Sequence, residues 1–298
     1  MKKVLITGSN GLLGQATVRL FRKDVEVIGC DIGSAAVDYF HPPQRYIQLD
    51  LTDRGRVKSQ LSGLKPEIII NTAAFTDVDG CESKTEACWL INAKAIEEMI
   101  DVSQAFSPLF VQISTDYVFD GNSGPYRETD TPKPLGYYGL SKYAAEKTIR
   151  NSNLEYIIAR SMILFGWGKD VRLNFVTWVV DQLKKRKKIR VVNDQIGNPT
   201  YTDDLAEALL RLIRKEEYGL FHIAGNEICS RFEFACKIAE IFDLDRSLIQ
   251  EIKTSDLGQK APRPMNSSFV LDKLSNTVDW LPSKLTDALK KLKSQLQL

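Results

Sequence analysis

The chain has 298 residues, of which 43% are hydrophobic and 26% charged, values typical of a globular protein that buries a sizeable core. Its 40 lysines and arginines nearly balance its 38 aspartates and glutamates, so the net charge gives no reason to expect a nucleic-acid partner. The sequence shows neither a secretory signal pattern nor an apolar run of membrane-spanning length. We therefore expect a cytoplasmic protein without a membrane partner.

Cysteine and histidine usage argues against disulfides and metal sites. The five cysteines have no C-x-x-C spacing, and we expect reduced, packed thiols. Cys30 ends a predicted strand, and the other four are expected in helices: Cys81, Cys88, Cys229 and Cys236. The only histidines, His41 and His222, give little material for a zinc site or a Ser-His-Asp triad, so we expect no metal.

Short β-branched runs alternate with helical patterns through the first half of the chain. The expected strands are Val4–Thr7, Val25–Cys30, Tyr46–Asp50, Glu67–Asn71, Leu109–Ser114 and Tyr156–Arg160. Helical patterns lie between them, including Lys84–Phe106 and Ser141–Asn151. This alternation predicts an α/β fold with a Rossmann-type, doubly wound parallel sheet covered by helices on both faces.

The first expected strand leads directly into Gly8, Gly11 and Gly14, and then into an amphipathic helix. Glycines in this register permit a tight turn, let the backbone approach a pyrophosphate and allow the helix to pack on the strand. The helix N-terminus adds free amides and the positive end of its dipole. A plain strand–turn–helix unit is the alternative, but the position after the first strand favours a dinucleotide site.

Aspartates end the second and third expected strands. Asp31 lies about 20 residues after the first glycine, where a carboxylate accepts from the adenosine 2′-hydroxyl and repels a 2′-phosphate. It therefore favours NAD over NADP, with capping of the next turn as the alternative. Asp50 is placed to reach the adenine end of the cofactor, unless it is only the N-cap of the following helix.

Small and hydroxyl-bearing residues follow the fourth and fifth expected strands. The segment Asn71-Thr72-Ala73-Ala74 is small enough for a cofactor ribose and nicotinamide to lie against its backbone. The segment Ser114-Thr115-Asp116 ends the fifth strand, and a hydroxyl at this edge can hold a substrate carbonyl oxygen.

Tyr138 and Lys142 are four residues apart, which places them on one face of a helix. An ammonium group beside a phenol stabilises the phenolate, so we expect Lys142 to lower the pKa of Tyr138 from its usual value near ~10. Tyr137 is a rival, but its spacing from Lys142 puts it on a different face. Such a pair on its own is commonly a surface feature. Together with the glycine turn and Thr115 it indicates a carbonyl/alcohol oxidoreductase that uses a nicotinamide.

The pattern changes after about Arg160, where strands become sparse and loops separate the helices. We expect residues 1–160 to form an NAD(P)-binding Rossmann domain and residues 161–298 to form mainly a smaller substrate-binding lobe over the carboxyl ends of the strands. The strand-like runs 189–192 and 220–223 could belong to either lobe, so we expect a discontinuous boundary. The basic run 184–188 could be a localisation or phosphate-binding patch, but a solvated helix end is the better interpretation.

These motifs resemble those of the extended short-chain dehydrogenases/reductases, and more narrowly those of the dTDP-4-dehydrorhamnose reductase family. The resemblance runs nearly end to end, through TGSNGLLG, NTAAFTDVDGCE, STDYVFDG, YGLSK, DQIGNPTYTDDLA, GLFHIAGN and APRPMNSSF. STDYVFDG and DQIGNPTYTDDLA are the more specific motifs, whereas Y-x-x-x-K marks the whole superfamily.

The resemblance implies reduction of the C4 keto group of a 4-dehydro-6-deoxy nucleotide-sugar by NADH or NADPH, with dTDP-4-dehydro-L-rhamnose as the first candidate substrate. It implies catalytic roles for Thr115, Tyr138 and Lys142. Substrate contacts are expected at Val78, Thr115, Asp116, Tyr117 and Arg263. Cofactor contacts are expected at Gly8, Asn10, Gly11, Leu12, Leu13, Gly14, Asp31, Ile32, Asp50, Leu51, Ala73, Ala74, Thr76, Asn92, Tyr138 and Lys142.

The chain departs from this family in ways that leave alternatives open. Ile163 stands where relatives often carry an aromatic residue near the sugar, so a sister 4-ketoreductase that makes another deoxyhexose is an alternative. Many relatives favour NADPH, in conflict with Asp31, and some bind magnesium at a dimer interface through glutamates that we cannot locate here. A homodimer is the assembly we consider. The alternative from another class is a non-catalytic regulatory subunit resembling that of methionine adenosyltransferase, against which the intact Thr115, Tyr138 and Lys142 argue.

Overall fold

The computed structural model describes residues 2–37 and 42–296, so His41 lies outside the described residues. The strands are β1 (Lys3–Thr7), β2 (Glu26–Asp31), β3 (Arg45–Gln48), β4 (Ile68–Asn71), β5 (Leu109–Thr115), β6 (Tyr156–Ser161), β7 (Leu164–Phe165), β8 (Ile189–Val192), β9 (Ile196–Gly197), β10 (Thr200–Tyr201), β11 (Gly219–His222), β12 (Cys229–Ser230) and β13 (Ile249–Ile252). The α-helices are α1 (Leu12–Phe21), α2 (Arg54–Leu64), α3 (Val78–Ser83), α4 (Thr85–Trp89), α5 (Ala95–Ser103), α6 (Tyr137–Arg150), α7 (Phe175–Lys184), α8 (Thr202–Arg214), α9 (Arg231–Ile241), α10 (Asp272–Val278) and α11 (Leu285–Leu296). Four shorter helical segments are η1 (Leu90–Lys94), which is a π-helix, and the 3₁₀ turns η2 (Asp116–Val118), η3 (Arg246–Leu248) and η4 (Thr254–Asp256).

Seven parallel strands form the central sheet, in the order β11-β6-β5-β4-β1-β2-β3. Continuous buried runs such as Ile68–Ile70 suit strands that are covered on both faces. The strand order reverses between β1 and β4, where the carboxyl ends of the strands leave a crevice for a ligand. The six strands expected in the first half are confirmed, and their ends move by at most two residues.

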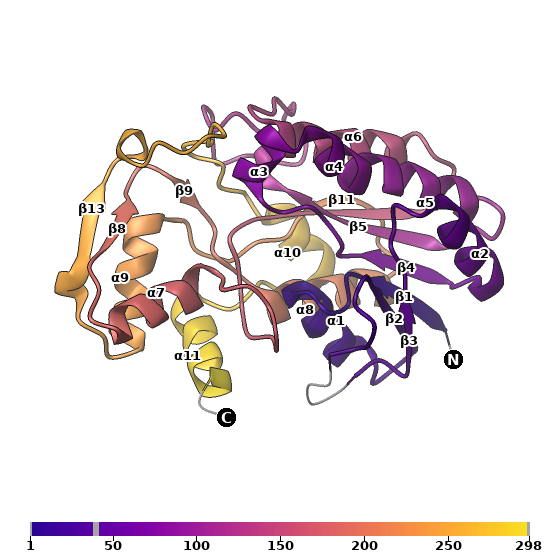
Figure 1. The fold of residues 1–298 in the computed structure, drawn as a ribbon, viewed down its shortest axis with the longest axis horizontal. Coiled ribbons are helices and arrows are strands. Elements are labelled where there is room, and N and C mark those ends of the chain that lie inside the picture. Colours follow the sequence, from indigo (N-terminus) through magenta and orange to yellow (C-terminus); the bar gives the residue numbers. More distant parts are fainter. Residues whose placement is uncertain (1, 38–41, 297–298) are drawn as a thin grey trace.

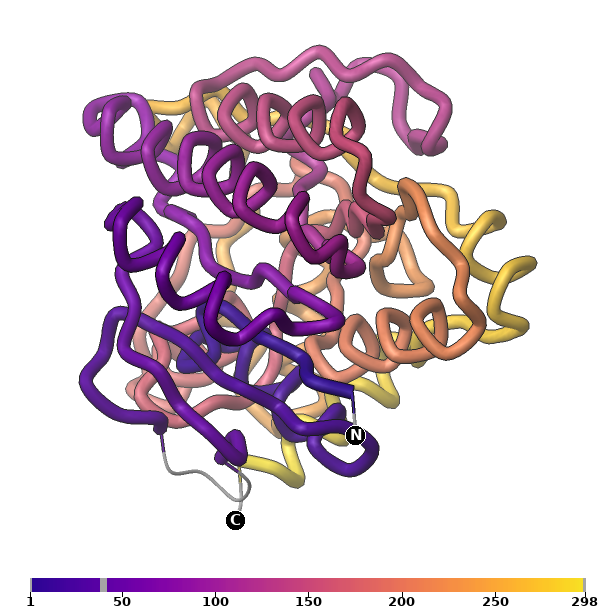
Figure 2. The backbone as a smooth tube through the Cα atoms, turned by 90° about the vertical axis from the view of Figure 1, so that its right-hand side faces the viewer, coloured from indigo at the N-terminus to yellow at the C-terminus, as the bar shows by residue number. Residues whose placement is uncertain are grey.

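Helices cover both faces of this sheet (Figure 1). One face packs on buried side chains of α2, α5 and α6, and α5 and α6 run side by side in the turned view of Figure 2. The other face packs on α1, α8 and α10. Because α8, β11 and α10 come from the second half of the chain, the chain returns to the sheet after leaving it.

A second hydrophobic core lies beside the sheet and is built from α7, α9 and α11. Three pairs of short strands belong to this side of the molecule: β7 with β10, β9 with β12, and β8 with β13. The two strand-like runs left open by the sequence therefore divide between the lobes. The run 189–192 forms β8 in the second lobe, and the run 220–223 corresponds to β11 of the central sheet. The division at about residue 160 stays a prediction.

Two helices differ from their expected bounds. The expected helix Lys84–Phe106 is broken into α4, η1 and α5, because a π-helical turn interrupts it at Leu90–Lys94. The helix expected from Ser141 begins four residues earlier, at Tyr137. Gly136 is its N-cap, and the backbone N–H of Tyr137 donates to the Glu82 carboxylate at 2.7 Å, which holds this first turn in place. Tyr138 consequently lies inside the helix.

The cysteines and the basic run 184–188 agree with what the sequence predicts, except for Cys229. All five cysteines are free, and four are buried. Cys229 lies in strand β12, so the helical expectation for it was wrong. Residues 184–188 are exposed at the end of α7, as expected of a solvated helix end.

Within residues 2–37 and 42–296, none of the helices has the length and apolar character that a membrane crossing requires.

Candidate active site

The glycine turn forms a backbone cradle between β1 and α1. Gly8 has a φ of +66°, and a side chain there would lie 2.7 Å from the backbone nitrogen of Ala73. A side chain at Gly14 would collide with the carbonyl oxygen of Gly8. Gly11 is the N-cap of α1, so the first amides of the helix are left for a ligand. The turn therefore fits the pyrophosphate of a dinucleotide, as its register predicts.

Asp31 ends β2 next to this turn. One carboxylate oxygen accepts from the backbone N–H of Asn10 at 3.0 Å, and the other accepts from the N–H of Ile32 at 2.8 Å. The Asn10 side chain in turn bonds the carbonyl of Ala35 and the Tyr46 hydroxyl. Asp31 thus links the glycine turn to the segment after β2, the side on which an adenosine ribose is expected.

Asp50 lies after β3 and is exposed. Its carboxylate accepts from the N–H and the hydroxyl of Thr52, at 2.9 and 2.7 Å. The N-cap of α2 is Asp53, so the interpretation of Asp50 as a helix cap was wrong. Asp50 and the buried Leu51 stay expected contacts at the adenine end.

Asn92 supports the segment after β4. Its amide accepts from the backbone N–H of Phe75 at 2.8 Å and donates to the Phe75 carbonyl at 3.1 Å. It also donates to the Ser141 hydroxyl on α6. The side chain is 1% exposed and lies in the π-helical turn, where it supports the segment of Ala73, Ala74 and Thr76; its contact with the cofactor stays a prediction.

The three expected catalytic residues come from two elements. Thr115 ends β5, where its hydroxyl accepts from the N–H of Tyr117, and Tyr138 and Lys142 lie one turn apart on α6. The Tyr138 ring meets the edge of Tyr117 with ring centroids 5.6 Å apart. Tyr137 instead packs on Trp89, at 6.0 Å between centroids. The geometry favours Tyr138 over Tyr137.

The charges at this site differ from the sequence expectation. Burial raises the pKa of Tyr138 above its usual value, the nearby Asp116 raises it further, and Thr115 acts in the opposite direction. Burial also lowers the pKa of Lys142 to about 8. The expectation of a lowered Tyr138 pKa was therefore wrong in its net direction, because it counted the charge of Lys142 and left out the loss of solvent.

Asp116 links Thr115 to a segment near the C-terminal end of the chain. Its carboxylate accepts from the Thr115 hydroxyl at 3.1 Å and from the hydroxyl of Ser267, which comes from the far end of the chain, at 2.6 Å. Burial raises the pKa of Asp116 in spite of these hydrogen bonds. The contact with Ser267 has no local signal in the sequence.

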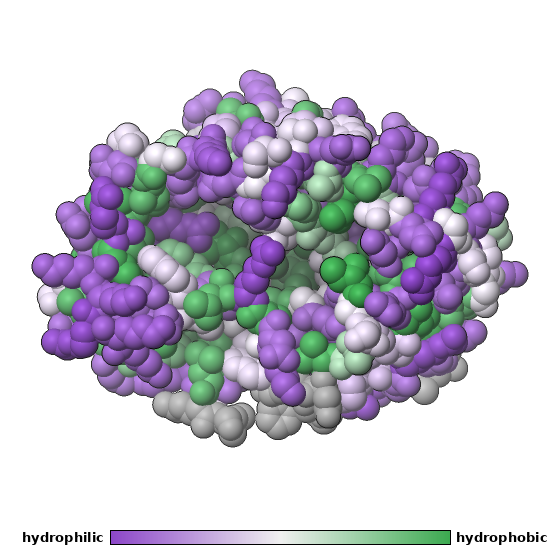
Figure 3. Space-filling model, viewed as in Figure 1, coloured by the Kyte–Doolittle hydropathy of each residue, from purple (hydrophilic) through white to green (hydrophobic). Residues whose placement is uncertain are grey.

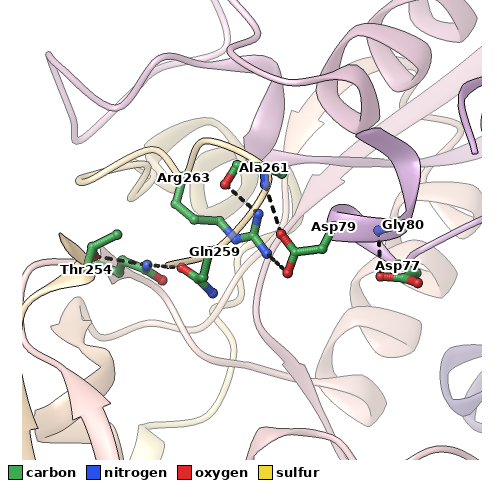
Figure 4. Close-up of polar contacts among 8 residues, drawn as sticks. Asp77, Asp79, Gly80, Thr254, Gln259, Ala261 and Arg263 are labelled. Atoms are coloured by element: carbon green, nitrogen blue, oxygen red, sulfur yellow. Dashed lines mark hydrogen bonds and ion pairs between the residues drawn. The ribbon is translucent and has the colours of Figure 1, made fainter. Parts of the chain in front are cut away.

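Arg263 lies against the start of α3, where it contacts Asp79 (Figure 4). Its guanidinium forms an ion pair with Asp79 of α3 at 2.9 Å and lies 5.9 Å from the Tyr117 ring centroid. Asp79 also accepts from the backbone N–H of Ala261 at 2.9 Å. Burial opposes the charge on Asp79, but these hydrogen bonds together hold its pKa below the usual value. Val78, the residue before Asp79, begins α3, so the expected substrate residues Val78, Tyr117 and Arg263 converge here.

Arg231 is a further cation at the site that the sequence did not reveal. It begins α9, and its guanidinium lies 5.3 Å from the Phe175 ring centroid. Burial lowers its pKa, while Tyr117 and Asp116 act electrostatically in the opposite direction. Among the described residues no carboxylate forms an ion pair with it. An arginine held in this way is suited to bind an anion.

Ile163 lies where the two lobes meet, in the turn between β6 and β7. Its φ is +48°, an uncommon conformation for a β-branched residue. A side chain at Gly197 would lie 2.9 Å from the end of the Ile163 side chain. The face of the molecule drawn in Figure 3 is hollowed near its centre, with hydrophobic side chains in the recess and hydrophilic ones around it. In the described part of the chain, no group of three or more His, Cys, Asp or Glu side chains could hold a metal ion.

The parallel sheet, the glycine cradle and the Thr115, Tyr138 and Lys142 group define a Rossmann-type nicotinamide oxidoreductase of the short-chain dehydrogenase/reductase kind. The chain belongs to the RmlD substrate binding domain family, whose model matches residues 1–298.

Individual relatives agree with this assignment. The chain is 35% identical to the spore coat polysaccharide biosynthesis protein SpsK of Bacillus subtilis over 269 residues, which cover 90% of this chain and 88% of that protein. The crystal structure of dTDP-4-dehydrorhamnose reductase from Bacillus anthracis in complex with NADP is 32% identical, with a TM-score of 0.89 and coverage of 99% and 100%. The methionine adenosyltransferase 2 subunit beta of Xenopus laevis is 31% identical over 280 residues, covering 92% of this chain and 81% of that protein.

Proposed function

We propose that the protein reduces the C4 keto group of a 4-dehydro-6-deoxy nucleotide-sugar with NADH or NADPH, and that dTDP-4-dehydro-L-rhamnose is its substrate and dTDP-L-rhamnose its product. The observation that carries the proposal is the convergence at one edge of the sheet. Thr115, Tyr138 and Lys142 lie beside two arginines, Arg231 and Arg263, that suit a diphosphate. The similarity to a dTDP-4-dehydrorhamnose reductase over nearly the whole chain supports the sugar.

The residues divide the reaction between them. A reduced nicotinamide held at the glycine cradle would supply the hydride to C4. Tyr138, which its raised pKa keeps protonated, donates the proton to the C4 oxygen, and Thr115 donates a hydrogen bond that orients that oxygen. Lys142, in its charged form, stabilises the phenolate that Tyr138 becomes and binds the nicotinamide ribose. The arginines bind the diphosphate and so hold the small reacting centre in place.

The cofactor contacts proposed for this reaction lie along the carboxyl ends of β1 to β4. The cradle of Gly8, Gly11 and Gly14 would bind the pyrophosphate, and Asp31 would bind the adenosine ribose. The complex of a relative with NADP makes NADPH a candidate, whereas the carboxylate of Asp31 supports NADH. We propose that the enzyme accepts both.

The test is oxidation of NADH or NADPH in the presence of dTDP-4-dehydro-L-rhamnose, followed by NMR of the product. Formation of dTDP-L-rhamnose at a rate that depends on Tyr138 is expected. Turnover of a related 4-keto sugar in its place would indicate a sister reductase that makes another deoxyhexose, the outcome that Ile163 motivates. The same purified protein, examined by light scattering, tests the proposed homodimer.

A second candidate is a non-catalytic regulatory subunit, because the chain is also 31% identical to the methionine adenosyltransferase 2 subunit beta. This candidate predicts tight cofactor binding, negligible turnover of any 4-keto nucleotide-sugar and stable association with a partner enzyme. The intact group of Thr115, Tyr138 and Lys142 argues for catalysis. We propose a cytoplasmic location for either role.

A further inference from the structure

A buried ion pair lies one helical turn beyond Lys142. Glu146 of α6 and Arg160 of β6 are 0% and 1% exposed. Their bond is bidentate, with Nε to Oε1 at 2.9 Å and Nη2 to Oε2 at 2.6 Å. The hydroxyl of Ser114, the residue before Thr115, also donates to Glu146. The Glu146 carboxylate therefore contacts two neighbouring strands, β5 through Ser114 and β6 through Arg160.

Lys142 is buried one helical turn before this carboxylate on α6. It is 3% exposed, and no described carboxylate forms an ion pair with it. Burial lowers its pKa to about 8, and Glu146 gives the largest opposing effect, followed by Cys88. The titratable groups of the surrounding elements are Tyr138 and Glu146 on α6, Cys88 on α4, Cys81 on α3, Asp116 after β5 and Arg160 on β6.

We propose that Glu146 is a positioning residue of the reaction: its carboxylate keeps Lys142 in the charged form, and its bond to Ser114 holds α6 against the end of β5 that carries Thr115. A carboxylate inside the protein acts on a neighbouring ammonium with little screening. Arg160 binds the opposite side of Glu146, so the carboxylate is not left unpaired in the core. The inference rests on the proposed function for its activity readout.

The electrostatic effect of Glu146 on Lys142 gives the test its sign. The active form needs protonated Lys142, so kcat/KM is full below the Lys142 pKa and is lost as the pH rises through it. Glu146→Gln removes the stabilising charge and should move this basic limb down by about one pH unit.

A double variant guards against misfolding. Glu146→Met with Arg160→Met removes both buried charges and keeps similar volume, a change that folded proteins often tolerate. It should also move the limb down, because Glu146 acts electrostatically on Lys142 and the double variant removes its charge. Ser114→Ala should lower kcat several-fold without moving the limb. If the single and double variants lower kcat while every limb stays in place, Glu146 has a structural role only and the inference is wrong.

A measurement without substrate separates this inference from the proposed function. Titration of ¹³C-labelled lysine side chains by NMR, with the Lys142 signal identified by its loss in Lys142→Met, reports the charge directly. A lower titration midpoint for Lys142 in the double variant supports the inference even when no 4-keto sugar is reduced. An unchanged midpoint overturns it whatever the enzyme reduces.

Discussion

The cofactor edge and the substrate side of this molecule are built in different ways. At the cofactor edge the ligand would meet backbone, shaped by the glycines between β1 and α1. On the substrate side it would meet long side chains that come from separate segments, such as Arg231 of α9 and Arg263 of the loop before α10. At the glycine turn, a substitution that adds even one side-chain atom collides with the backbone. On the substrate side, in contrast, the side chains that contact the ligand can be substituted one at a time. Related enzymes can therefore keep the cofactor and vary the sugar.

The largest expected effect is a loss of kcat on substitution of Tyr138, which lies between the cofactor edge and the substrate side. Tyr138→Phe should lower kcat by at least about a hundredfold, because general-acid catalysis contributes 10²–10⁴. Cofactor affinity should stay nearly unchanged. Tyr137→Phe is the matched control, since that ring packs on Trp89 and should leave kcat intact. Near-normal turnover of Tyr138→Phe in steady-state kinetics would contradict the mechanism.

The second prediction breaks the backbone cradle. Gly14→Ala places a methyl group against the Gly8 carbonyl and the Cα of Ser9, and the turn must shift. We expect the Kd of the reduced cofactor, measured by its fluorescence, to rise by about tenfold or more, because close backbone approach is lost. Gly63→Ala in α2 meets no atom within 4 Å and should leave the Kd unchanged. Equal effects of the two variants would show that the cradle does not hold the cofactor.

The third prediction concerns the two arginines proposed to bind the diphosphate, Arg231 and Arg263. Arg231→Met should raise KM for the nucleotide-sugar about tenfold and leave KM for the cofactor unchanged, since bonds to a charged ligand contribute about 1.5–3 kcal/mol. Arg263→Lys should raise the same KM by less, because Asp79 already neutralises Arg263. Arg150→Met, at the exposed end of α6, is the control. An unchanged nucleotide-sugar KM in both site variants would mean that the diphosphate is held elsewhere.

The smallest expected effect is the choice of cofactor. Asp31→Ala removes a carboxylate that would face the 2′-phosphate of NADPH, so kcat/KM for NADPH should rise several-fold relative to NADH. Asp53→Ala removes the N-cap of α2 and should lower the melting temperature without altering that ratio. The ratio of the two cofactors' kcat/KM values in each variant decides the point, and an unchanged ratio in Asp31→Ala would remove Asp31 from the ribose site.

The sequence was most informative where a contact lies within one strand–turn–helix unit. The glycine turn and the spacing of Tyr138 and Lys142 depend on neighbours a few residues away, and the placement of Asp31 follows from the length of one strand–helix–strand unit, so periodicity and spacing predict them. The contacts of Asp116 with Ser267 and of Asp79 with Arg263 join segments far apart in the chain. No local pattern encodes such a meeting, which is why Arg231 was missed.

The sequence also predicted the wrong direction for the pKa of Tyr138, because it does not show how the fold buries this residue. The pair of Tyr138 and Lys142 was correctly located, but the direction of the pKa of Tyr138 depends on how deeply the whole sheet edge is covered. Burial is a property of the complete fold, so counting neighbouring charges along one helix could not supply it. The start of α6 at Tyr137 was missed for a similar reason, since Glu82 on another helix holds that turn.

The pairing of β11 with β6 has a consequence for how the chain reaches this fold. Strand β6 is complete at Ser161, but the strand that covers its free edge is not made until residues 219–222. During synthesis from the N-terminus, β6 therefore presents unpaired backbone groups and apolar side chains until β11 emerges from the ribosome. A chain interrupted after α8 would keep the whole nicotinamide edge and still expose that strand, so such fragments should aggregate rather than fold.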